Sequence, residues 1–106
     1  MQIVTHAPRL TLSPALRNHI ERRLETAIKA FESRVRRISV RLIDLNGPKG
    51  GIDTRCRIQA QSTRGEELVV SGTGENGFAA VSYAVDRLHR LMRRRLGDRK
   101  AGRRHS

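Results

Sequence analysis

Apolar and polar positions follow two different periods along the chain, and these periods predict where strands and helices lie. Residues 2–5 form a short β-branched stretch, which is typical of a first strand. Strict alternation over 37–44 predicts a second, half-buried strand. The same two-residue period over 55–61, and a short apolar run within 67–72, predict a third and a fourth strand.

A period of three to four residues marks the first predicted helix. Ser13 is a good N-cap residue, and Pro14 suits the first helical position that follows it. Apolar residues then recur at intervals of four, four, four and three: Leu16, Ile20, Leu24, Ile28 and Phe31. This spacing predicts one helix of about five turns that buries a single face and ends after Phe31.

A second helix is predicted near the C-terminal end. Asn76 can cap its first turn, and Gly97 is expected to end it. The apolar stripe between them has intervals of three, four, three and four: Phe78, Val81, Val85, Leu88 and Met92. We therefore expect Phe78, like Phe31, to belong to the core.

These elements follow the order β-α-β-β-β-α. The last three strands are joined by short connections, so they should form an antiparallel meander, whereas the first crossover places the first two strands parallel. Each helix has one apolar stripe and the sheet one apolar face. The predicted fold is therefore α+β: a two-layer sandwich of a four-stranded sheet with both helices on one face. We expect one domain over 1–97 and a basic flexible tail over 98–106.

A G-x-G-x-x-G pattern at 72–77 lies between a predicted strand and a helix, where a dinucleotide fingerprint would lie. That fingerprint requires a further parallel strand after the helix, and the chain continues in arginines instead. Glu75 would also repel a pyrophosphate. We therefore interpret 72–77 as a flexible turn followed by a helix cap, and we predict no nucleotide site.

The charge of the chain points to its partner. Its 106 residues include 22 Lys and Arg against 10 Asp and Glu, a formal net charge of +12. Such a charge favours a polyanion: nucleic acid, an anionic membrane or an acidic protein. Nine basic and two acidic residues fall within 86–104, which gives that segment a net charge of +7. A helix that lies on a membrane needs free apolar residues, and here the core accounts for them.

Residues that carry enzyme chemistry are sparse. The histidines His6, His19, His89 and His105 have no metal-ligand spacing, and Cys56 falls on the apolar side of a strand. We therefore predict no catalytic residue, metal, cofactor or small-molecule substrate. One cysteine excludes an intrachain disulfide, and neither a secretory signal nor a membrane-spanning run is present. A cytoplasmic protein is expected.

Nucleic acid is the polyanion that we expect this chain to bind, and the aromatic residues help to define its kind. Only two Phe and one Tyr are present, and none lies on a predicted strand. A strand platform that stacks single-stranded bases is therefore not expected. Arginine and lysine contacts to phosphate remain, and these depend on salt and hardly on sequence. A folded RNA with a fixed backbone shape suits such a surface.

The whole pattern resembles the family of ribosome hibernation promoting factors and ribosome-associated inhibitors, some of which carry an older label of sigma-factor modulation. The resemblance rests on the order of elements, the helix start at 13–16 and, above all, the segments 77–81 and 85–88. It implies a bacterial stress or stationary-phase protein of the cytoplasm. Such proteins bind the small ribosomal subunit in the channel used by mRNA and tRNA, and they inhibit translation by occupancy.

Family members present basic residues of both helices to ribosomal RNA. The candidates in this sequence are Arg22, Arg23, Lys29, Arg87, Arg90, Arg93, Arg94 and Arg95, followed by Arg99 and Lys100 in the tail. Two features depart from the family pattern. A C-terminal dimerisation domain is not seen, so the chain is expected to silence single ribosomes or to help a second factor pair them. The loop at 47–51 and the arginine-rich end are also unusually basic and rich in glycine.

Two other functions stay open at this point. One is a general module for structured or double-stranded RNA, which has similar fold elements. The other is a regulatory protein-interaction module, as the older family label suggests.

Overall fold

The computed structural model describes residues 2–8, 10, 12–45 and 53–97. In chain order the elements are β1 (Gln2–His6), α1 (Pro14–Ile28), the 3-10 helix η1 (Lys29–Arg34), β2 (Val35–Asp44), β3 (Thr54–Ser62), β4 (Glu67–Gly74) and α2 (Gly77–Arg95). The predicted loop at 47–51 and the predicted tail at 98–106 lie outside the described residues.

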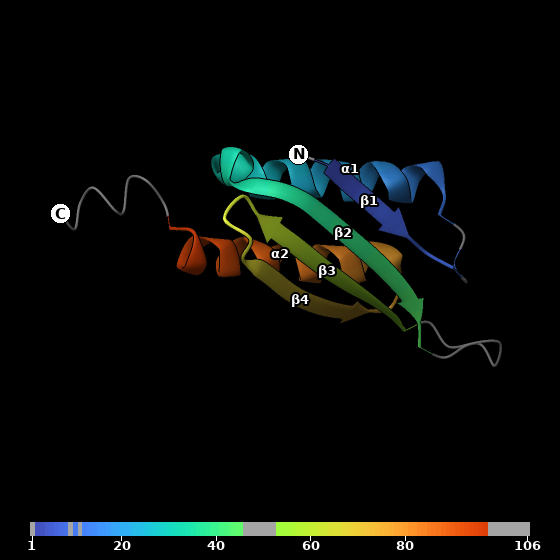
Figure 1. The fold of residues 1–106 in the computed structure, drawn as a ribbon. Coiled ribbons are helices and arrows are strands. Elements are labelled where there is room, and N and C mark those ends of the chain that lie inside the picture. Colours follow the sequence, from blue (N-terminus) through green and yellow to red (C-terminus); the bar gives the residue numbers. More distant parts are fainter. Residues whose placement is uncertain (1, 9, 11, 46–52, 98–106) are drawn as a thin grey trace.

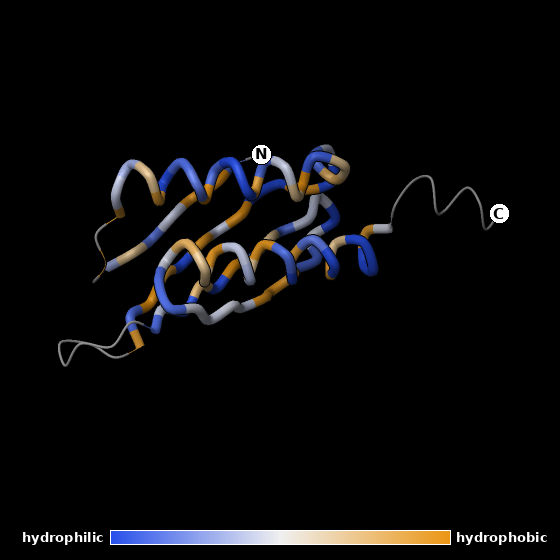
Figure 2. The backbone as a smooth tube through the Cα atoms, turned by 180° about the vertical axis from the view of Figure 1, so that it is seen from behind, coloured by the Kyte–Doolittle hydropathy of each residue, from blue (hydrophilic) through white to orange (hydrophobic). Residues whose placement is uncertain are grey.

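The four strands form one sheet in the order β1-β2-β3-β4. β1 runs parallel to β2, and the two following pairs are antiparallel. Both helices lie behind the sheet in Figure 1 and side by side over it in Figure 2, which shows the molecule from the other side. The buried apolar side chains of helices and strands form one core between the two layers. The predicted fold class is confirmed.

Helix α1 begins as its sequence predicts but ends earlier. The Ser13 hydroxyl accepts a hydrogen bond from the backbone N–H of Leu16 at 3.1 Å, and Pro14 is the first helical residue. The prediction of one helix through Phe31 is wrong, because α1 ends at Ile28 and Phe31 lies in η1. A 3-10 helix has three residues per turn, so the interval of three between Ile28 and Phe31 keeps Phe31 in the core, 1% exposed.

Strand β2 begins two residues before the predicted alternation. A bulge shifts its register against β3 between Val35 and Arg37. Val35 and Ile38 are therefore both buried although they are three positions apart, while Arg36 and Arg37 between them are exposed. Because of this irregular spacing, a two-residue period does not detect the first residues of the strand.

The G-x-G-x-x-G segment is part of the packing between β4 and α2. β4 continues to Gly74, so the predicted flexible turn is wrong, whereas the predicted cap is confirmed: Asn76 Oδ1 accepts from the N–H of Ala79 at 2.9 Å. A Cβ on Gly72 would lie 2.5 Å from the backbone N of Ala84, and one on Gly74 would lie 2.6 Å from Ala79 Cβ. These glycines let the helix approach the strand.

Helix α2 ends at Arg95, and Gly97 follows with a φ of +74°, as expected for a glycine that ends a helix. The prediction that Phe78 belongs to the core is wrong, since its side chain is 42% exposed. Alanines take the inner positions of the first turns instead: Ala80 and Ala84 are buried, where α2 comes close to the glycines of β4.

Candidate nucleic-acid interface

The candidate residues of the first helical segment differ in whether they have hydrogen-bond or ion-pair partners inside the domain. Arg22 and Lys29 are exposed, and the structure gives neither a hydrogen bond nor an ion pair within its described residues. Lys29 opens η1 and does not belong to α1. Arg23 instead turns towards α2, where a terminal N–H donates to Asp86 Oδ1 at 2.9 Å and to the Ser82 carbonyl at 3.5 Å. Arg23 is therefore in part a tie between the two helices.

Two of the α2 candidates also have partners inside the domain. Arg87 donates to the Ser71 carbonyl of β4 at 2.9 Å, and Arg95 forms an ion pair with Glu66 at 3.0 Å. Arg90, Arg93 and Arg94 are exposed and make no ion pair with any residue that the structure describes. These three are the α2 cations most available to a ligand.

The structure brings three predicted arginines together at the β4 edge. A hollow of about 410 Å³ between α2 and β4 is lined by Arg87, Arg90 and Arg94, beside Ser71 and Leu91. Its guanidinium groups form a basic wall next to a strand edge, a shape that suits a phosphate backbone. We call this hollow the α2–β4 groove.

The α1 candidates lie on the other side of α2. His19 Nε2 lies 3.1 Å from Ser82 Oγ and 3.2 Å from the Phe78 carbonyl, and His89 Nδ1 lies 2.8 Å from the Ala27 carbonyl. Together with the Arg23–Asp86 pair, these contacts hold α1 against the flank of α2 that faces away from the groove. Arg22 and Lys29 are thus not gathered with Arg87 and Arg94, although both groups belong to the helical layer. The predicted residues Arg99 and Lys100 lie outside the described residues.

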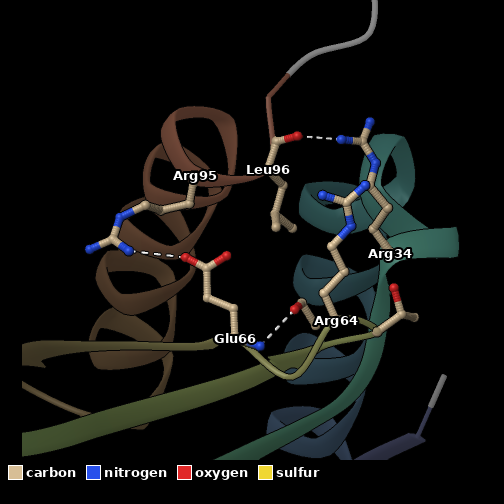
Figure 3. A pocket seen from close by; sticks show the side chains of 7 residues that line it. Arg34, Arg64, Glu66, Arg95 and Leu96 are labelled. Atoms are coloured by element: carbon tan, nitrogen blue, oxygen red, sulfur yellow. Dashed lines mark hydrogen bonds and ion pairs between the residues drawn. The ribbon is translucent and has the colours of Figure 1, made fainter.

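Another basic cluster lies where η1, the β3–β4 turn and the end of α2 meet. Arg34, Arg64, Glu66 and Arg95 line a pocket of about 160 Å³ (Figure 3). Arg34 donates to the carbonyl of Leu96, the C-cap of α2, and its guanidinium lies 5.8 Å from the centre of the Phe31 ring. A cation at a helix C-terminus satisfies free carbonyls and the helix dipole. This cluster therefore first serves to fix the end of α2.

Sequence reasoning missed four arginines of the sheet. Arg37 and Arg41 of β2, and Arg55 and Arg57 of β3, are exposed and alternate with buried neighbours. They therefore lie on the sheet face opposite the helices. The alternation that predicts these strands already places the four side chains on one face, so the signal was present in the sequence.

Two aromatic side chains are more exposed than a core role would allow. Phe78 meets the His19 ring edge to face, with ring centres 5.2 Å apart, and Tyr83 is 55% exposed. Both belong to the first half of α2. The described strands carry no aromatic residue, in agreement with the expectation from the sequence.

Groups suited to catalysis or metal binding are not gathered in the described part of the chain. Cys56 is fully buried, and burial raises the pKa of its thiol to about 12, so it stays protonated and poorly nucleophilic near neutral pH. No group of three or more His, Cys, Asp or Glu side chains that could hold a metal ion occurs among the described residues. No helix in the described ranges is long and apolar enough to cross a membrane.

Fold and surface together define a small two-layer α+β protein with a strongly basic helical layer. Residues 3–100 match the family described as sigma 54 modulation protein / S30EA ribosomal protein, and the chain belongs to this family. The family resemblance stated from the sequence is thereby confirmed.

Solved structures have the same fold. One, a ribosomal subunit interface protein from Coxiella burnetii, superposes with a TM-score of 0.75 at 16% identity, covering 89% of this chain and 96% of that one. Another, the N-terminal domain of Thermus thermophilus Protein Y, gives a TM-score of 0.67 at 24% identity, covering 88% and 93%. At these identities the likeness concerns the fold. No protein with a curated description matches the sequence.

Proposed function

We propose that this protein is a ribosome-associated translation inhibitor of the hibernation type, which binds ribosomal RNA of the small subunit through the basic faces of its helices. Family membership supports a ribosome-associated protein of the cytosol. The name of the Coxiella structure, a ribosomal subunit interface protein, agrees with this role. The protein acts by occupying the mRNA and tRNA channel and catalyses no reaction.

The observation that carries the proposal is the set of exposed cations without an internal partner in the helical layer. Arg90, Arg93 and Arg94 of α2 have no ion pair among the described residues, and Arg90 and Arg94 also line the α2–β4 groove. Arg22 and Lys29 add two such charges on the α1 side. Arg23, Arg87 and Arg95 contribute less to binding because each already has a partner inside the domain.

We assign the ribosome-binding domain to residues 1–97, and Arg99 and Lys100 add charge from the segment 98–106. Contacts to phosphate explain why the helices need arginine but no stacking platform. Such contacts release counterions, so binding should weaken by several powers of ten for each tenfold rise in salt if about six residues contact phosphate.

Sedimentation of ribosomes tests the proposal directly. Purified protein mixed with ribosomes or with small subunits should co-sediment at low salt and should inhibit translation in a purified system. Recovery only in the ribosome-free fractions at low salt would overturn it. A footprint on the small subunit should fall in the mRNA and tRNA channel.

The two alternatives give different results in the same assays. A general module for structured RNA would be displaced from ribosomes by excess bulk duplex RNA, whereas a ribosome-specific factor would stay bound. A protein-interaction module would retain its partner in nuclease-treated extract. Ribosome pairing with the help of a second factor would appear as a shift from single to paired ribosomes only when that factor is present.

A further inference from the structure

The sheet face that points away from the helices carries a second concentration of positive charge. Figure 1 looks onto this face, with both helices behind it. The strand registers arrange its residues in rows that run across the sheet. One row joins His6, Arg41, Arg57 and Ser71. The next row on one side contains Arg55, and Arg37 lies two rows away on the other side. We call this surface the outer sheet face.

Its four arginines have no acidic partner within the described residues. Arg37, Arg41, Arg55 and Arg57 are exposed and take part in no ion pair there. Two acidic residues, Glu67 and Asp53, lie near this face, one at each end of β3. Glu67 accepts a hydrogen bond from Gln59 Nε2 at 2.6 Å, and Asp53 precedes β3.

Two of these arginines lie directly opposite each other, and the repulsion between their charges lowers the stability of the fold. Arg41 and Arg57 are direct partners across β2 and β3, and His6 of β1 is the partner of Arg41 on its other side. Directly opposed side chains have their Cβ atoms about 5 Å apart, and like charges at such positions repel each other. Repulsion of this kind is relieved when an anion lies between the two guanidinium groups.

The shape of the face suits an extended anionic chain. A hollow of about 330 Å³ is lined by the opposed arginines together with Ser39, Gln59, Val4 and His6. Residues two apart on one face of a strand are about 6.8 Å from each other, so Arg55 and Arg57 can contact neighbouring phosphates of one strand. Arginine, serine and glutamine supply hydrogen-bond donors to phosphate oxygens, and no described strand residue is aromatic.

We propose that the outer sheet face is a second RNA-binding surface, which holds a segment of sugar-phosphate backbone on the side of the domain opposite to the helices. If the proposed function holds, this RNA is ribosomal, and the domain lies between two RNA segments, one on each layer. The contact to RNA backbone itself rests on the sheet and not on the proposed function. The interaction is one of phosphate contact, so it depends on salt and reads no base.

Neutralisation of the opposed pair tests the surface. The full-length variant Arg41→Gln/Arg57→Gln and a charge-matched control, Arg17→Gln/Arg64→Gln, each lose two exposed arginines. Binding to ribosomes is measured over a series of salt concentrations. Loss of two phosphate contacts should reduce the slope of log affinity against log salt by about 2. The control should change the slope much less, and the melting temperature of the sheet variant should stay equal or rise.

The outcomes separate this proposal from the proposed function. If the sheet variant behaves as the control does, while Arg90→Glu/Arg94→Glu loses binding, the helical site stands and the sheet proposal is overturned. If the wild type does not bind ribosomes, the same salt series is run on ribosomal RNA freed of protein. A salt slope that is lower for the sheet variant, but not for the control, still supports the surface. If the sheet variant lowers binding only to vesicles rich in phosphatidylglycerol, the face binds a membrane and the RNA proposal fails.

A tethered cleavage reagent provides an independent measurement. Because Cys56 is fully buried, Gln59→Cys places a single accessible thiol on the outer sheet face, and Glu25→Cys places one on exposed α1. An iron chelate attached at each site should cut RNA in the ribosome complex at two separate segments. If the chelate at residue 59 gives no cleavage above that of free reagent while the one at residue 25 does, the sheet proposal is overturned.

Discussion

Gly72 in β4 lies directly against the backbone of Ala84 in α2, so close that a Cβ on the glycine would be 2.5 Å from the Ala84 nitrogen and 2.8 Å from the Ala80 carbonyl oxygen. Both neighbours are backbone atoms of one helix, which cannot turn aside as a side chain can. Gly72 therefore allows α2 to pack closely against the sheet at this point.

Replacement of Gly72 by alanine should destabilise the domain strongly. The added methyl group must push α2 away from β4, and overpacking of this kind costs about 2 kcal/mol or more. For a domain of this size we expect the melting temperature to fall by about 10 °C or more in calorimetry. Thr73→Ala is the matched control on the same strand, since Thr73 is exposed. Equal melting temperatures for the two variants would contradict the close packing.

The ion pair between Arg23 and Asp86 should contribute little to stability but should limit RNA binding. The pair is partly exposed, so Arg23→Gln should lower the free energy of unfolding by less than about 1 kcal/mol. Asp86→Asn replaces the ion pair with at most a neutral hydrogen bond, while Arg23 keeps the Ser82 carbonyl as a partner. Because it also removes a negative charge from the helical layer, it should raise ribosome affinity a few-fold. Titration of wild type and both variants against ribosomes measures the effect. A lower affinity for Asp86→Asn would indicate that the pair positions Arg23 for binding.

Much of the fold follows from sequence patterns because burial repeats at regular intervals within each element. The strand alternation and the helix caps at Ser13 and Asn76 depend on neighbouring residues only, and both were predicted. The change from α1 to η1 before Phe31 and the bulge after Val35 break these periods, so a regular template misplaces the boundaries. The exposed position of Phe78 could not be predicted either, since the apolar spacing alone does not show that Ala80 and Ala84 take the inner positions.

The sequence predicts which segments of the candidate site carry positive charge, but it predicts less well which of the arginines are free to bind a ligand. Residues far apart in the chain decide which arginines are free: Arg23 meets a residue 63 positions later, and Arg95 meets Glu66, 29 positions earlier. Such pairings leave no trace in a local pattern. The outer sheet face was overlooked for a different reason, because Arg41 and Arg57 served only to define the polar side of their strands.

Charge reversal at Arg90 and Arg94 should weaken ribosome binding strongly and leave the fold intact. Both side chains are exposed on α2, line the α2–β4 groove and make no ion pair among the described residues. Arg90→Glu/Arg94→Glu replaces two attractions with two repulsions, and we expect affinity to fall on the order of 100-fold at moderate salt. Co-sedimentation measures the loss, and circular dichroism checks the fold.

The matched control for this reversal is Arg17→Glu/Arg64→Glu, which changes the net charge equally at exposed positions that line neither the α2–β4 groove nor the hollow of the outer sheet face. If the control loses as much affinity as the groove variant, binding follows net charge alone and the site assignment to α2 is wrong. A loss restricted to the groove variant supports a located contact.

Cys56 gives a prediction about pH. Burial raises the pKa of its thiol from 9.0 to about 12, so the folded protein keeps the proton that an unfolded chain loses above pH 9. Between these values the unfolded state binds fewer protons, and the free energy of unfolding falls as pH rises, by at most about 1.4 kcal/mol per pH unit from this group. Below pH 9 the thiol is protonated in both states and contributes no pH dependence.

Urea unfolding of wild type and Cys56→Ala at pH 8 and pH 10.5 isolates the effect: the wild type should lose more stability over this interval than the variant. In the same samples, a thiol reagent at pH 8 should react with the wild type only as fast as the domain opens. Rapid labelling of the native protein, or equal losses of stability in the two proteins, would show that the thiol is accessible and not held in the core.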